Sequence, residues 1–276
     1  MRTSFKERTK AFPTFVLLAY TLTWLFWIPT AFSGKDFKTT PWLIPVFLGG
    51  FGPSVAGIIM VYRREDRTNQ RDFWKRVVNV RSITAGWYLF ILLVFPLIAA
   101  LALGFSRLVG DPLSEFSMLS RLASSPLMLI GTVLLGIVTG PLSEELGWRG
   151  FALDALQTRW SPLAASLILA PVWWAWHIPL FFIRGSTQFE WGFGTPSFWL
   201  FTIGIIPLSV LLTWVYNQND RSILAAILLH FSYNFTLGLI PLSVSVNLYH
   251  VILLFIVSGT VVMAGGNTYK GRVQSS

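Results

Sequence analysis

The sequence contains no cysteine, so it can form no disulfide, no thiolate nucleophile and no sulfur-ligated metal site. Charged residues are also scarce, at 12% of the 276 residues, which is about half of their share in an ordinary soluble domain. Hydrophobic residues make up 54% of the chain. This composition indicates a polytopic membrane protein whose chemistry depends on oxygen and nitrogen groups.

Apolar runs long enough to cross a membrane recur along the chain. A transmembrane helix needs about 20 mainly apolar residues, and eight segments meet that need: 12–32, 41–62, 86–107, 126–157, 163–183, 197–216, 222–240 and 248–266. The connections are too short to hold a soluble domain. We therefore predict an all-α fold with about eight transmembrane helices, forming a single integral-membrane domain over residues 1–276.

The basic residues are unevenly distributed over the predicted loops. The two terminal tails and the connections after spans two, four and six hold 15 of the 21 Lys and Arg residues. Because Lys and Arg accumulate in cytoplasmic loops, this asymmetry predicts that both termini are cytoplasmic. The net charge of +9 is thereby explained as a topology signal, and we expect no nucleic-acid partner. The basic segment 66–82 is either an interfacial helix on an anionic leaflet or a solvated loop.

Three of the predicted spans carry polar residues that are costly in a bilayer. Ionisable groups inside a span are expensive unless they face a cavity or a partner, so each is a functional candidate. At about 1.5 Å per residue from the cytoplasmic end of each span, Glu144 and His177 lie roughly 20 Å deep, Asn234 roughly 18 Å and His230 roughly 12 Å. These similar depths predict that the groups meet at one site. His250, near the outer end of the last span, is expected to be interfacial and outside that site.

Helical spacing separates the two adjacent glutamates. Glu145 and Arg149 are four residues apart with the acid nearer the N-terminus, which favours a structural ion pair. Glu144 is rotated by about 100° around the helix and has no local partner, so it is the better candidate for chemistry.

The same four-residue spacing relates two further pairs. Trp173 and His177 share one helix face, and so do His230 and Asn234, so each pair can address one point in space. We expect Trp173 to shape the pocket.

These groups suit hydrolysis without a covalent intermediate. A carboxylate beside a histidine can take a proton from water, while a second histidine and an amide stabilise an oxyanion. The sequence has neither the GxSxG motif of a serine hydrolase nor the HExxH motif of a zinc protease. We expect no cofactor. The alternative is one zinc ion held by Glu144, His177 and His230, and Asn234, a poor zinc ligand, argues against it.

The three motifs resemble those of the CPBP family of intramembrane metalloproteases or glutamic endopeptidases. This family includes CAAX prenyl protease 2-type enzymes and bacteriocin-processing, Abi-like proteins. Its motifs EExxxR, aromatic-xxx-His and HxxxN are matched in order, within about residues 126–240, by Glu144 with Glu145 and Arg149, by Trp173 with His177, and by His230 with Asn234. Tryptophan replaces the usual phenylalanine at Trp173, which puts the shape of the substrate pocket in question.

The resemblance implies a role for each motif. Glu144 activates water with help from His177, His230 and Asn234 form the oxyanion hole, and Glu145 with Arg149 supports the site. It also implies a cavity open to the cytoplasmic leaflet.

We therefore predict an intramembrane endopeptidase of the cell membrane. Its partners are membrane lipid and a peptide or prenylated protein, with C-terminal CAAX processing as one activity, and the sequence predicts no particular oligomeric state. Two alternatives come from other classes. One is a proton-coupled transporter in which Glu144 and the histidines relay protons, which the lack of an internal repeat disfavours. The other is a non-catalytic membrane scaffold or immunity protein.

Overall fold

A computed structural model describes residues 5–39, 41–112, 116–240 and 242–265, and these residues form helices and turns with no strand. The α-helices are α1 (Phe5–Ser33), α2 (Leu43–Gly50), α3 (Gly52–Arg64), α4 (Arg67–Val78), α5 (Ala85–Leu108), α6 (Ser117–Ser124), α7 (Pro126–Ile137), α8 (Ser143–Gly147), α9 (Asp154–Gln157), α10 (Pro162–Trp176), α11 (Thr187–Trp191), α12 (Pro196–Gln218), α13 (Ile223–Leu239) and α14 (Val244–Ala264). Two π-helical turns, η2 (Val138–Leu142) and η3 (Trp148–Leu153), and two 3-10 turns, η1 (Val80–Ser82) and η4 (Ile178–Phe182), join some of them.

The all-α membrane fold predicted from the sequence is confirmed. Within the described residues, seven helical segments are long and apolar enough to cross a membrane, and they correspond to seven of the eight predicted spans. The remaining span, 222–240, is the apolar helix α13, which has only 17 residues. At about 1.5 Å per residue it is roughly 25 Å long, slightly less than the hydrocarbon thickness. It packs against α5, α7, α12 and η2.

Side-chain caps and prolines explain where many of these helices begin. Ser125, Ser161 and Thr195 each accept a hydrogen bond from the backbone N–H three residues later, and a proline follows each of them in the first turn. Proline is tolerated there because the first N–H groups of a helix have no intrahelical partner. Ser222 and Ser243 cap α13 and α14 in the same way.

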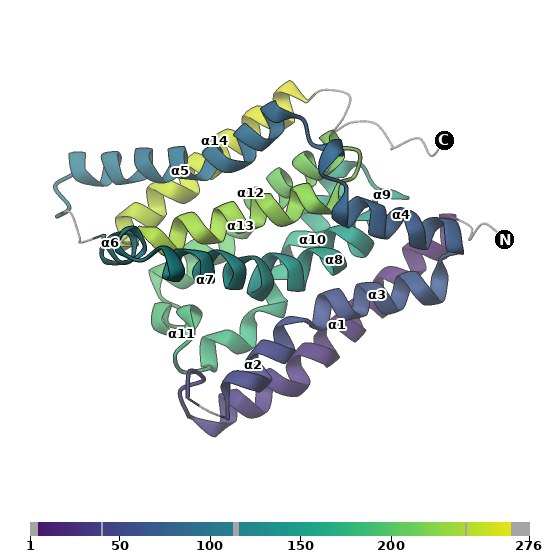
Figure 1. Cartoon of the computed structure of the whole chain (residues 1–276), viewed down its shortest axis with the longest axis horizontal. Helices are drawn as coiled ribbons and strands as arrows, with labels where there is room; N and C mark the ends of the chain where they lie inside the picture. Colours follow the sequence, from purple (N-terminus) through teal and green to yellow (C-terminus); the bar gives the residue numbers. More distant parts are fainter. Residues whose placement is uncertain (1–4, 40, 113–115, 241, 266–276) are drawn as a thin grey trace.

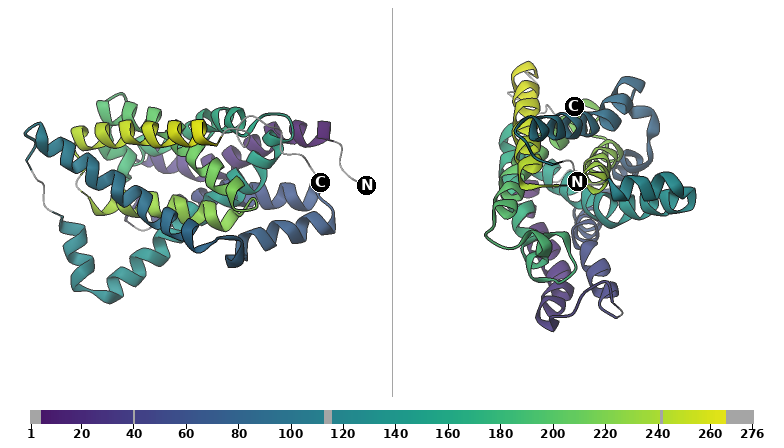
Figure 2. Two further views of the ribbon diagram at one scale, coloured as in Figure 1. Left: turned by 90° about the horizontal axis from the view of Figure 1, so that it is seen from above. Right: turned by 90° about the vertical axis from the view of Figure 1, so that its left-hand side faces the viewer.

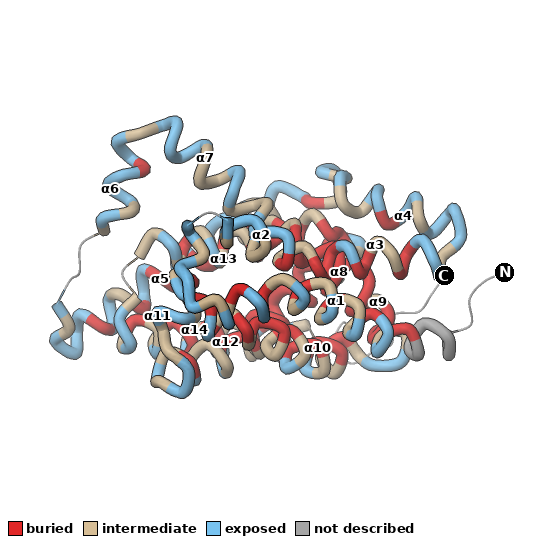
Figure 3. Tube along the Cα trace, turned by 90° about the horizontal axis from the view of Figure 1, so that it is seen from below, coloured by how far each residue is buried: buried red, intermediate tan, exposed pale blue. Residues whose placement is uncertain are grey.

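The loops divide between two ends of the helix bundle. We call the end formed by residues 63–82, 158–161 and 219–222 the basic end, and the opposite end, formed by residues 34–39 and 183–195, the mouth end. In Figure 1 the start of α1, α4 and α9 lie to the right, whereas α11 and the turn between α1 and α2 lie to the lower left. Helices α6 and α7 form an arm that projects from the bundle (Figure 2). Buried residues concentrate in the middle of the bundle, around α8, α10 and α12 (Figure 3).

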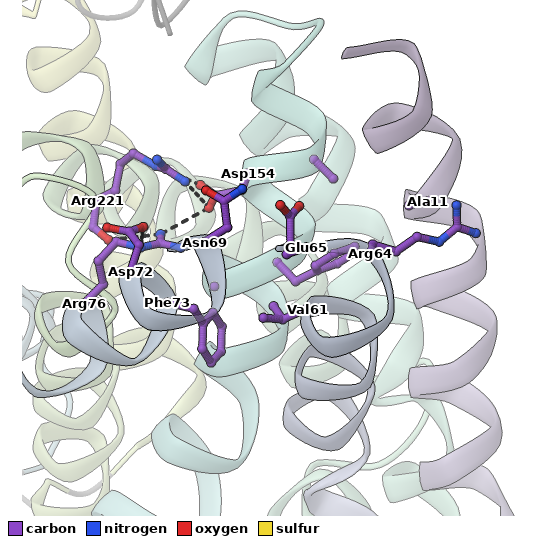
Figure 4. Close-up of a pocket in the computed structure, with 13 residues that line it drawn as sticks. Ala11, Val61, Arg64, Glu65, Asn69, Asp72, Phe73, Arg76, Asp154 and Arg221 are labelled. Atoms are coloured by element: carbon purple, nitrogen blue, oxygen red, sulfur yellow. Dashed lines mark hydrogen bonds and ion pairs between the residues drawn. The ribbon is translucent and has the colours of Figure 1, made fainter. Parts of the chain in front are cut away.

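A network of charged and polar side chains holds the basic end together. The Asp154 carboxylate, at the start of α9, accepts hydrogen bonds from Tyr216 Oη at 2.6 Å and Arg76 Nη1 at 3.1 Å, and pairs with Arg221. It thereby links α4, α12 and the turn before α13, beside a pocket of about 60 Å³ (Figure 4). Arg221 and its neighbour Asp220 have φ angles of 58° and 53°, which only a few per cent of non-glycine residues adopt. The Asp154 carboxylate raises the pKa of Arg221.

The basic segment 66–82 contains a helix, in line with the first of its two predicted alternatives. Asp66 caps α4 by accepting a hydrogen bond from the Asn69 N–H. Phe73 is buried, whereas Trp74 is exposed. The helix therefore presents one apolar side chain to the bundle and a second to its surroundings.

Helix α3 packs against α8 at very short range. A Cβ atom on Gly147 would stand 2.1 Å from the Pro53 carbonyl oxygen, and one on Gly57 would stand 2.8 Å from the Gly147 Cα atom. Small residues allow two membrane helices to approach in this way. The Ser54 hydroxyl also donates to the Leu142 carbonyl oxygen at 2.9 Å. Helix α3 is thus the support of the segment that carries the two glutamates.

Candidate active site

Three helices bring the polar residues of the sequence motifs to one cavity. The cavity has a volume of about 620 Å³, and Glu144 from α8, Trp173 and His177 from the end of α10, and His230 and Asn234 from α13 all line it. The convergence expected from their depths is therefore present in the structure. Their catalytic roles remain predictions.

The two glutamates occupy different environments, as their helical spacing predicts. Glu144 lines the cavity, and its Oε2 accepts a hydrogen bond from Trp173 Nε1 at 2.6 Å. Glu145 has no exposed surface and is absent from the cavity wall. Only Glu144 is therefore positioned to touch a molecule in the cavity.

Glu145 is engaged by two side chains behind the cavity. Its Oε1 lies 2.9 Å from Arg149 Nη1, so the predicted ion pair is present, and 2.7 Å from His230 Nδ1. A carboxylate oxygen accepts hydrogen bonds, so His230 donates through Nδ1 and keeps Nε2 for another partner. The Arg149 guanidinium carbon also lies 4.3 Å from the centre of the Trp173 ring, a cation–π contact. Trp173 therefore contacts both the glutamate on the cavity wall and the buried arginine.

His177 is held by its own helix and by aromatic rings. It caps the C-terminus of α10, and its Nδ1 lies 2.8 Å from the Trp173 carbonyl oxygen. A carbonyl oxygen only accepts, so the proton lies on Nδ1 and Nε2 is left with its lone pair. Its ring packs edge-on against Trp176 and Phe201, with ring centres 4.7 and 5.5 Å away. Nε2 is thus a potential proton acceptor beside the cavity.

Asn234 approaches Glu144 at a glycine. A Cβ atom on Gly140 would stand 3.0 Å from Asn234 Nδ2 and 4.0 Å from Glu144 Oε1. Gly140 lies in the π-helical turn η2, next to Pro141, which has no N–H to donate and disturbs regular α-helical bonding. The glycine and the proline together allow the amide and the carboxylate to lie close to each other.

The zinc alternative finds no compact ligand set. Among the side chains of the described residues, no three His, Asp or Glu converge closely enough to hold a metal ion. The Nδ1 atoms of His230 and His177 are engaged with Glu145 and with a backbone carbonyl, which leaves the Nε2 atom of each ring available to a ligand. Zinc binding by Glu144, His177 and His230 would require these side chains to move.

The structure corrects one expectation and adds residues that the motifs did not indicate. His250 is not interfacial: it has no exposed surface, because α14 packs along α5 and α12. Its ring centre lies 5.6 Å from that of Tyr233, a cavity residue. Tyr233, Trp176 and the short helix α11 also line the cavity. Tyr233 follows His230 by three residues, and that helical spacing could have indicated it.

The cavity lies in the half of the bundle next to the mouth end. Its wall includes Lys38, Thr187 and Gln188, which belong to the loops and the short helix of that end. The start of α1 and the end of α14 (Figure 1) lie away from that end. The cytoplasmic termini and the cavity open to the cytoplasmic leaflet, both expected from the sequence, stay predictions.

Comparison with known proteins defines the class. Residues 126–236, the segment that contains all three motifs, match the family model described as Type II CAAX prenyl endopeptidase Rce1-like. The fold and the match together identify a CAAX protease-like intramembrane endopeptidase, as the motifs predicted.

A particular relative extends the similarity to nearly the whole chain. "CAAX prenyl protease 2" of Methanococcus maripaludis is 26% identical over 267 residues, which cover 95% of this chain and 96% of the relative. The resemblance recognised from the three motifs is thus confirmed by two comparisons.

Proposed function

We propose that this protein hydrolyses a peptide bond within the membrane by means of water activated by Glu144. The observation that carries the proposal is the different engagement of the two glutamates. Glu145 is bound to Arg149 and His230, whereas Glu144 lines the cavity and accepts one hydrogen bond, from Trp173. The protein would lie in the cell membrane with both termini cytoplasmic, an orientation supported by the distribution of its basic residues.

The reaction needs one proton acceptor and one oxyanion site. Glu144, assisted by His177 Nε2, takes a proton from water, and the water oxygen attacks the carbonyl carbon of the scissile bond. The proton then passes from Glu144 to the amide nitrogen as the C–N bond breaks, which yields a carboxylic acid and an amine. No covalent enzyme intermediate is formed.

The oxyanion site consists of Asn234 and His230. Because His230 Nδ1 donates to Glu145, its Nε2 can donate to the oxyanion only if the imidazole carries both protons. The positive charges of His230 and Arg149 then balance the negative charges of Glu144 and Glu145. A balanced set of paired charges is less costly to bury than a single unpaired one. The position of Glu145 between Arg149 and His230 supports this arrangement.

Trp173 positions the catalytic carboxylate in this scheme. Its indole N–H holds Glu144 Oε2, while its ring contacts Arg149 and meets the His230 ring edge-on at 5.4 Å. A phenylalanine could make the ring contacts but could not donate the hydrogen bond. The tryptophan that replaces the usual phenylalanine of the family therefore adds a hydrogen bond, which restrains the Glu144 carboxylate.

The character of the cavity supports an apolar, membrane-embedded substrate. Aromatic and aliphatic side chains such as Trp27, Phe47, Phe201 and Leu208 form much of its wall. The name of the archaeal relative supports a farnesylated CAAX peptide as the first substrate to test.

The direct test measures cleavage of a farnesylated CAAX peptide by the purified protein in detergent. Glu144→Gln should lower the rate at least about 100-fold, the range for loss of a general base. Glu190→Gln is the matched control, because Glu190 is exposed on α11 and lies outside the cavity wall. It should cleave at the wild-type rate, and a chelator should leave the wild-type rate unchanged.

Two results would contradict the proposal. One is a Glu144→Gln variant that cleaves as fast as the wild type. The other is a folded wild-type protein that cleaves neither the farnesylated peptide nor unmodified membrane peptides. Loss of activity in chelator, restored by zinc, would instead favour the metal alternative.

A further inference from the structure

The mouth-end rim of the cavity carries an inference about the part of the substrate that lies there. We propose that Lys38, together with the polar side chains of Thr187 and Gln188, binds the free C-terminal carboxylate of the peptide that is cleaved at Glu144. For the chemistry this inference rests on the proposed function, and it adds a residue that selects the substrate by the charge at its end.

The cavity wall holds one permanent positive charge and one carboxylate. Among the described residues that line the cavity, Lys38 is the only lysine or arginine, and Glu144 is the only aspartate or glutamate. Glu144 lies on α8 in the middle of the bundle, whereas Lys38 lies in the loop after α1, at the mouth end. The wall therefore suits a ligand whose negatively charged end stays at the rim, away from the proposed catalytic carboxylate.

Hydrogen bonds hold the loop that carries Lys38 in place. The Lys38 N–H donates to Asp36 Oδ1 at 2.8 Å, and the Thr39 N–H donates to the Asp36 carbonyl oxygen at 3.1 Å. An aspartate that accepts from the backbone two residues later forms a compact turn. The Phe37 N–H donates to the Arg184 carbonyl oxygen at 3.0 Å, which joins this loop to the loop before α11. The Lys38 backbone therefore has a defined position relative to α11.

The polar side chains of the rim are available to a ligand. No carboxylate in the part of the chain that the structure describes pairs with the Lys38 ammonium group. The Asp36 carboxylate instead accepts from the Lys38 backbone and packs against Gly185. The side chains of Thr187 and Gln188, which also line the cavity, form no hydrogen bond with another described residue. An ammonium group, a hydroxyl and an amide can thus donate hydrogen bonds to one anion.

Apolar side chains line the wall inwards from the rim. Helix α12 begins near α11 and runs towards the basic end, and its residues Phe201, Ile205 and Leu208 border the cavity. The Phe201 ring also packs against Trp191 of α11, with ring centres 5.5 Å apart. From Phe201 to Leu208 the helix rises by about 10 Å, which an extended peptide covers with about three residues. A peptide whose last residues are apolar and whose terminus is charged therefore fits both the wall and the rim.

Recognition of a terminal carboxylate would make the site selective for chain ends. An internal segment with the same apolar residues has no negative charge where its chain passes Lys38. Because Lys38 is exposed, its ion pair with a carboxylate is screened by solvent and changes affinity by a few-fold. Lys38 is therefore a specificity residue, and the chemistry at Glu144 does not depend on it.

The test compares two peptides that differ only in their terminal charge. A farnesylated CAAX peptide with a free carboxylate and the same peptide with a C-terminal amide are bound to the Glu144→Gln protein in a neutral detergent. The carboxylate peptide should bind about fivefold more tightly, and adding Lys38→Met should bring the two dissociation constants within about twofold of each other. Cleavage of both peptides by protein that retains Glu144 gives the same comparison as a ratio of kcat/KM values.

Two further variants separate the charge from the structure of the loop. Lys38→Arg retains the positive charge and should keep the preference for the carboxylate peptide. Lys35→Met removes an exposed lysine of the same loop that lies outside the cavity wall, and it should also keep the preference.

Several results would overturn the inference. These are equal dissociation constants of the two peptides, a preference that survives Lys38→Met, and failure of both peptides to bind. Equal affinities together with a stabilising effect of phosphatidylglycerol that requires Lys38 would assign the rim to a lipid phosphate instead. Cleavage of both peptides without a preference would keep the proposed function and overturn the inference. Binding with the expected preference but without cleavage would keep the assignment of the rim and contradict the proposed function.

Discussion

At the residue scale, two adjacent glutamates of one short helix lie in different environments. Glu144 and Glu145 differ by one step of the helix, yet one lines the cavity and the other is enclosed by protein. The spacing to Arg149 was enough to predict this separation, because residues four apart on a helix face each other. The second partner of Glu145, His230, comes from a helix 85 residues later and was not predictable from local spacing.

Arg149 is predicted to be essential for stability. Arg149→Ala should lower the free energy of unfolding by about 3–5 kcal/mol, because it leaves the Glu145 carboxylate buried without its guanidinium partner. Unfolding of the purified protein in mixed detergent micelles measures this change. Arg63→Ala removes an exposed guanidinium at the basic end and should change the stability by less than about 0.5 kcal/mol. A fully stable Arg149→Ala protein would contradict the assignment of the ion pair.

His250 shows where residue-level prediction fails. A histidine near the end of an apolar span is ordinarily expected at the interface, where it can remain hydrated. In the structure it is buried because neighbouring helices cover that part of α14, and the covering depends on packing between segments far apart in the sequence. Periodicity predicts which residues share a face, but it does not identify the helix that covers that face.

At the element scale, the sequence predicted the number of spans better than their internal shape. The span 41–62 is two helices, α2 and α3, which meet at Phe51. Gly52 follows this break, and a Cβ atom there would stand 2.1 Å from the Thr23 hydroxyl. Hydropathy indicates only whether a segment is apolar. A break between two helices whose residues are all apolar therefore leaves no mark in the hydropathy of the sequence.

The close packing of α3 on α8 predicts opposite effects for two glycine substitutions. Gly147→Ala should lower the free energy of unfolding by about 1–3 kcal/mol, because its new methyl group would overlap the Pro53 backbone. Gly259→Ala in α14 meets nothing within 4 Å and should be neutral or stabilising by up to about 1 kcal/mol, since alanine favours helix more than glycine does. Thermal unfolding of both variants in the same detergent measures the difference. Equal stability of the two would contradict the packing.

At the scale of the whole molecule, charge and shape divide the protein into two ends. The uneven distribution of basic residues was visible in the sequence, and the common depth of the motif residues was approximately correct. The direction in which the cavity opens was not visible, because it depends on which halves of α10, α12 and α13 border an empty space. The resemblance to a family implied a cytoplasmic opening, and the side of the membrane that the mouth end faces stays a prediction.

The Asp154 network is predicted to hold the basic end together. Asp154→Asn should lower the free energy of unfolding by about 2 kcal/mol. This is less than the loss expected for a fully buried ion pair, because the Arg221 side chain is 41% exposed. The substitution should also release α4, so that trypsin cleaves more rapidly after Lys75 in the folded protein. Asp220→Asn, at an exposed turn residue whose positive φ suits asparagine, is the control and should behave as wild type. Unchanged cleavage of α4 in Asp154→Asn would contradict the role of the network.

The two π-helical turns on either side of α8 have a consequence for how this protein can change. A π-helical turn holds one residue more than the α-helical turn it replaces, so deleting one residue within η2 would restore a regular turn and leave the residues beyond it facing as they do now. A deletion in a regular α-helix instead rotates everything beyond it by about 100°, the angle that separates Glu144 from Glu145. A single deletion in the α-helical part of this segment would thus turn the wrong carboxylate towards the cavity, whereas one within η2 would keep Glu144 there. We expect single-residue differences in length among homologous proteins in this segment to fall within the two π-helical turns.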